Sequence, residues 1–65
     1  MTGKLITILG FRADIHVNQQ AKDLYNPQAA AELYEEAAML ATSAMKGKTA
    51  AMFYEKVETA LTLIE

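Results

Sequence analysis

The stretch KLITILGFRADIHVN, residues 4–18, decides the fold, because its apolar residues suit more than one kind of secondary structure. Its first half is a run of mostly β-branched residues that ends at Gly10. Apolar and polar residues then alternate from Phe11 to Asn18, a period of two that is typical of a half-buried strand. We therefore expect a strand region at 4–18, either a hairpin that turns between Gly10 and Asp14 or one long strand bulged at Gly10.

A helix over residues 12–25 fits part of the same stretch. Ala13, Val17, Ala21 and Leu24 follow one another at steps of four or three residues, which places them on one helical face. The sequence leaves strand and helix open for residues 11–25. We favour a strand through about Val17, followed by helical or irregular structure.

The sequence around Asn26-Pro27 predicts the start of a helix. An asparagine side chain accepts a hydrogen bond from the first helical turn, and a proline loses nothing there by lacking an N–H group. We expect this helix at about 27–46, with Gly47 as the residue that ends it, since glycine adopts the left-handed conformation required after a helix.

A second helix is expected at about 49–64, with Thr49 as its N-cap. The connection between the two helices is short, so they should pack as an antiparallel αα-hairpin. The predicted fold class is therefore α+β: an N-terminal strand or hairpin followed by a helical hairpin, all within a single domain of residues 1–65.

The size and composition of the chain predict self-association. A domain of 65 residues buries too little surface to be more than marginally stable, and such domains usually need disulfides, a metal or a second copy. The chain has no cysteine, and 52% of its residues are hydrophobic. We expect apolar surface that one copy leaves exposed, completed by a dimer or higher oligomer.

Several apolar residues of the two expected helices lie outside the stripes that should join those helices. We expect these residues, together with tyrosines and methionines of both helices, at an interface with another copy or a partner protein. The candidate interface residues are Tyr34, Ala38, Met45, Met52, Phe53 and Tyr54.

The residue types argue against catalysis and against a metal. His16 is the only histidine, and no nucleophile with a base beside it is recognisable. A structural zinc site needs about four cysteine or histidine ligands, which the chain lacks. We therefore expect no enzyme activity, no cofactor and no metal.

The charge balance and the apolar runs bear on partners and location. Six basic residues against eight acidic ones disfavour nucleic-acid binding. No apolar run approaches the ~20 residues that span a membrane, and the N-terminal run is too short for a signal peptide. We expect a soluble, cytoplasmic protein that does not bind membranes.

The segment GKLITILGFRAD, residues 3–14, resembles the ribbon strand of ribbon-helix-helix DNA-binding proteins. The resemblance implies a dimer whose paired strands read the major groove of DNA. The contacts would be drawn from Lys4, Thr7, Arg12 and His16. The acidic charge balance and the long gap before the first clear helix place this hypothesis second.

A third hypothesis is an oligomer that binds a small molecule or nucleotide at a subunit boundary. The candidate ligand contacts are Arg12, His16, Lys46 and Lys48. The leading hypothesis remains a small, non-enzymatic homo-oligomer that binds and modulates a partner protein, as accessory or inhibitor proteins do.

Overall fold

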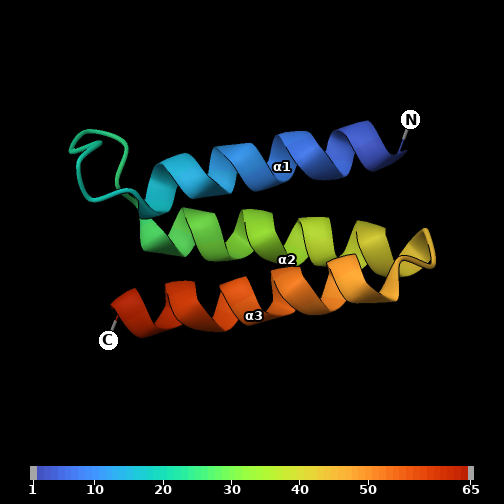
Figure 1. Cartoon of the computed structure of the whole chain (residues 1–65). Coiled ribbons are helices and arrows are strands. Elements are labelled where there is room, and N and C mark those ends of the chain that lie inside the picture. The colour runs from blue at the N-terminus through green and yellow to red at the C-terminus, as the bar shows by residue number, and fades with distance from the viewer. Residues whose placement is uncertain (1, 65) are drawn as a thin grey trace.

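The computed structural model describes residues 2–64. Over that range it has three helices, α1 (Thr2–Val17), α2 (Pro27–Ser43) and α3 (Gly47–Ile64). The helices lie side by side with α2 in the middle, antiparallel to both neighbours, so α1 and α3 run in the same direction (Figure 1). The molecule measures 34 × 22 × 13 Å. The three helices form a layer that folds around one shared core, because Phe53 of α3 also reaches Gly10 of α1.

The predicted α+β fold is wrong, because the expected strand region at 4–18 is helical as far as Val17. Ile6, Leu9 and Ala13 are buried at steps of three and four residues, which is the spacing of one helical face. The alternation of period two and this helical spacing share the same residues. Packing against α2 favours the helix over the strand. The apolar surface that this helical face buries outweighs the low helix propensity of Gly10 and of the β-branched residues.

The two other readings of the N-terminal region are corrected by the same helix. The reading of residues 12–25 as a helix has the right type of structure at the wrong place, since α1 ends at Val17 and a loop of turns occupies 18–26. The resemblance to ribbon-helix-helix proteins rested on a strand at residues 3–14. It is wrong, because these residues are helical.

The α2 helix begins where the sequence places a helix start and ends earlier than expected. The side-chain oxygen of Asn26 accepts a hydrogen bond of 3.1 Å from the N–H of Ala29. At the other end, Met45 adopts a positive φ of 61°, and the N–H of Lys46 donates to the carbonyl of Ala41 at 2.8 Å. A left-handed residue after the helix was predicted at Gly47; the residue that adopts this conformation is Met45, two residues earlier.

The α3 helix begins at Gly47, two residues before its expected cap. The carbonyl of Lys46 accepts the N–H of Ala50 at 2.9 Å, so the first helical hydrogen bond precedes Thr49. Thr49 lies within the first turn instead of capping it. The expected antiparallel arrangement of the two C-terminal helices is seen in Figure 1.

Alanines on the central helix allow both neighbours to approach it closely. Helix separation depends on the side chains at the contact, and small residues shorten it. The buried residues of α2 are Ala30, Ala31, Tyr34, Ala37, Ala38 and Ala41. They cover both flanks of α2 that the sequence marks as apolar. The second apolar flank, expected to need another subunit, is thus covered by the chain itself.

His16 holds the loop between α1 and α2. Its ring Nδ1 lies 2.6 Å from the carbonyl oxygen of Leu24, and a carbonyl only accepts, so Nδ1 carries the proton. The backbone carbonyl of His16 accepts the N–H of Asn26 at 2.8 Å. Within the part of the chain that the structure describes, no helix has the length and apolar character needed to cross a bilayer.

Candidate functional site

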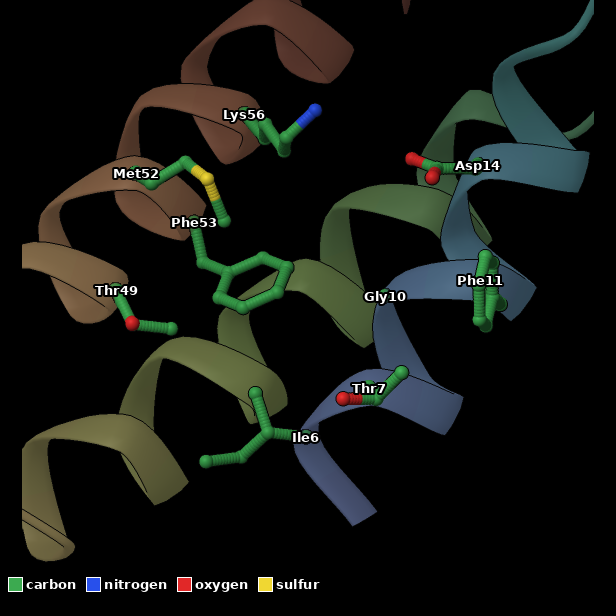
Figure 2. A pocket seen from close by; sticks show the side chains of 9 residues that line it. All are labelled: Ile6, Thr7, Gly10, Phe11, Asp14, Thr49, Met52, Phe53 and Lys56. Carbon is green, nitrogen blue, oxygen red and sulfur yellow. The ribbon is translucent and has the colours of Figure 1, made fainter. Parts of the chain in front are cut away.

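A groove of about 260 Å³ opens between α1 and α3 on one side of the layer. Both helices contribute side chains to its walls, and Figure 2 shows them around the opening. The lining residues are Ile6, Thr7, Gly10, Phe11, Asp14, Thr49, Met52, Phe53 and Lys56. The groove is mainly apolar, with one acidic and one basic side chain at the same end.

The floor of the groove depends on the absence of a side chain at Gly10. The ring of Phe53 points from α3 toward Gly10 (Figure 2). A Cβ at Gly10 would lie 3.1 Å from two carbons of that ring, closer than ordinary van der Waals contact. A glycine inside a helix costs about 1 kcal/mol relative to alanine. Here the glycine lets the ring of α3 reach the backbone of α1.

Tyr34 lies beneath the groove and joins all three helices. Only 3% of its surface is exposed. Its hydroxyl donates a hydrogen bond to the carboxylate of Asp14 on α1, and its ring packs against Phe53 of α3 with 6.1 Å between ring centroids. Burial, followed by the hydrogen bond and negative charge of Asp14, raises the pKa of Tyr34 well above the usual tyrosine range.

The two charged groups of the groove face each other. The ammonium group of Lys56 points from α3 toward α1, and the carboxylate of Asp14 points from α1 toward α3 (Figure 2). The Nζ of Lys56 also lies 5.6 Å from the centroid of the Tyr34 ring, within the range of a cation–π contact. One wall of the groove is therefore negative and the opposite wall positive.

A second exposed surface lies on α1, on the side turned away from α2. We call it the outer face of α1. It carries the half-exposed apolar residues Leu5, Ile8 and Ile15 and the cations Lys4 and Arg12. Phe11, which lines the groove, lies at the border between this face and the groove. Helix α1 is thus apolar both toward α2 and away from it. Exposed apolar residues that gather on one surface mark a site of interaction.

The interface residues predicted from the sequence are divided between core and surface. Tyr34, Ala38 and Phe53 are buried within the chain's own core. Met52, 45% exposed, lies on the wall of the groove. Tyr54 is equally exposed on α3 but does not line the groove, and Met45 is 92% exposed in the turn after α2.

The predicted ligand contacts are not brought together. His16 lies at the end of α1 and bonds to the loop, whereas Lys46 and Lys48 lie around the start of α3. Because α1 and α3 run in the same direction, these are opposite ends of the layer (Figure 1). Arg12 is exposed on the outer face of α1. Within one copy, over residues 2–64, these four side chains do not lie together.

Sequence reasoning missed the pair Asp14 and Lys56 and the outer face of α1. The signal for the outer face was present: Leu5, Ile8 and Ile15 follow helical steps once α1 is taken as a helix. Nothing in the sequence pairs Asp14 with Lys56, because they meet only when α1 and α3 lie parallel. The chain matches no protein-family model, no curated protein and no solved structure.

Proposed function

We propose that this chain is a small, non-enzymatic protein that self-associates and that binds and modulates a partner protein in its assembled form. The observation that carries the proposal is the amount of large apolar surface that the three helices leave exposed. Over the described residues, twelve large apolar side chains are at least 39% exposed. Apolar surface of this extent marks a site of interaction with another protein or another copy.

The exposed area supports the same conclusion. The chain has 4684 Å² of accessible surface and a mass of 7.1 kDa. A compact monomer of that mass exposes about 4,100 Å², so the layer exposes roughly 600 Å² more than expected. Burying that excess on each of two copies gives an interface of roughly 1,200 Å², the lower bound for specific, stable interfaces. A reversible dimer is the expected form.

The outer face of α1 is the surface we assign to the partner. Its apolar residues follow helical steps, which suits an amphipathic helix packed along α1. Lys4 and Arg12 lie eight residues apart, or about 12 Å along the helix axis. Both are positive, so the face favours a partner helix with carboxylates beside its apolar stripe. None of these outer-face residues lines the groove, so both surfaces can be occupied together.

Affinity capture with matched variants tests the partner surface. Ile8→Glu places a negative charge on the outer face of α1, whereas Met39→Glu places one on the exposed side of α2; Ile8 is 47% and Met39 58% exposed. We expect a protein that co-purifies in stoichiometric amounts with the wild type and with Met39→Glu, and is lost with Ile8→Glu. Equal recovery with all three chains, or none with the wild type, contradicts the proposal.

A further inference from the structure

We propose that the groove between α1 and α3 is the dimer interface, and that it pairs with the same groove of a second copy about a two-fold axis parallel to the helices. The inference rests on the proposed self-association and names its surface and symmetry. The observation behind it is that the two walls of the groove match in residue spacing and oppose each other in charge.

The matching spacing follows from the parallel course of α1 and α3. On α1, Thr7 and Asp14 line the groove seven residues apart, and on α3 Thr49 and Lys56 do the same. Two parallel helices have the same rise per residue, so each pair spans the same length. The threonines lie at one end of the groove and the charges at the other.

A two-fold axis parallel to the helices brings each wall against the opposite wall of the other copy. Such a rotation leaves the position of every residue along the helix axes unchanged. It places α1 of the second copy opposite α3 of the first, and α3 of the second copy opposite α1 of the first. Asp14 of one copy then faces Lys56 of the other, and the reverse pair forms at the same level. The four charges alternate in sign around the axis, so each carboxylate has two ammonium neighbours.

The apolar middle of the groove is buried by the same rotation. Phe11, 65% exposed, comes opposite the wall that carries Met52, which is 45% exposed. Sulfur and aromatic rings make favourable contacts, and both side chains are large enough to fill the space between the walls. Helices α1 and α3 of the two copies then form a four-helix core, with each α2 on the outside.

The charges distinguish this arrangement from the other face-to-face dimer. A two-fold axis across the helices would place α1 antiparallel to α1 and α3 antiparallel to α3. Asp14 would then face either Asp14 of the second copy or uncharged residues. Lys56 would likewise face either Lys56 of the second copy or uncharged residues. Like charges that face each other across an interface cost several kcal/mol. The dimer whose two-fold axis runs parallel to the helices is therefore favoured over the antiparallel one.

A mixed-charge experiment tests the pairing by native mass spectrometry of the full chain. Lys56→Glu makes both walls of one chain negative, and Asp14→Lys makes both walls of another chain positive. We expect each variant alone to dimerise at least about tenfold more weakly than the wild type, because like charges meet. Mixing the two variants restores a dimer that contains one chain of each kind.

The controls separate this inference from the proposed function. Circular dichroism shows whether each variant folds, because Asp14→Lys also removes the acceptor of the Tyr34 hydroxyl. Ile8→Glu on the outer face should leave the dimer intact, whereas Met52→Glu in the groove should dissociate it. If the wild type forms a dimer and each charge variant alone dimerises equally well, the groove interface alone is overturned. The same holds if the two folded variants form no mixed dimer. A wild type that stays monomeric overturns self-association as well.

Discussion

Tyr34 shows how one side chain links the core to the groove. Its ring fills the space between the alanines of α2 and Phe53, while its hydroxyl reaches the carboxylate of Asp14 at the groove wall. The tyrosine therefore fixes the position of a charge on which the proposed dimer depends. A phenylalanine at this position would fill the same space and leave Asp14 free to turn.

The raised pKa of Tyr34 predicts a loss of stability at alkaline pH. Below about pH 10 the tyrosine is protonated in both the folded and the unfolded chain. Above that pH the unfolded chain loses the proton while the folded chain keeps it, so the free energy of unfolding falls by up to about 1.4 kcal/mol per pH unit. Tyr34→Phe removes this fall, because phenylalanine does not titrate.

Urea denaturation of the wild type and Tyr34→Phe across this pH range measures the effect. Near neutral pH the variant should be less stable by about 1 kcal/mol, the usual contribution of one hydrogen bond. The difference should shrink as the pH rises above about 10. Tyr25 and Tyr54 are present in both chains, so their titration cancels in the comparison. A difference that stays constant with pH would contradict the burial of Tyr34.

At the scale of the elements, the alanines of α2 determine how closely α1 and α3 approach. Ala37 is fully buried in the middle of α2. Replacing it with leucine adds volume to a closely packed contact, which typically costs about 1–3 kcal/mol. Thermal unfolding should show a lower Tm for Ala37→Leu. Met39→Leu, on the exposed side of the same helix, should change stability by less than about 0.5 kcal/mol. Equal effects would show that the alanine flank is not packed as described.

The two C-terminal helices were predictable because their start and connection have local causes. Asn26-Pro27 gives a helix start through its own hydrogen-bonding chemistry, and the short connection requires antiparallel neighbours. Residues 4–18 were not predictable in this way. Their pattern satisfies a strand and a helix together, and only the alanine flank of α2, distant in sequence, favours the helix.

The groove was less accessible to sequence reasoning than the fold. Asp14 and Lys56 are 42 positions apart and oppose each other only because α1 and α3 are parallel. The left-handed residue after α2, Met45, was also missed, since a glycine two residues later looked like the better candidate. Backbone hydrogen bonds from Met45 and Lys46 stabilise a left-handed methionine that propensity disfavours.

At the scale of the whole molecule, the shape accounts for the proposed behaviour. The three helices bury the two flanks of α2 and leave the outer face of α1 and the groove uncovered. The two surfaces differ in charge: the outer face is positive, while the groove carries one charge of each sign. A groove with both signs is complementary to itself, and a uniformly positive face is complementary to an acidic partner.

Sedimentation equilibrium of the purified wild-type chain tests the central claim, that one copy leaves a surface for a second. We predict a mass near twice 7.1 kDa at high protein concentration, falling toward 7.1 kDa on dilution, as mass action requires for a reversible dimer. A mass of 7.1 kDa at every concentration, from a folded helical chain, would contradict the account.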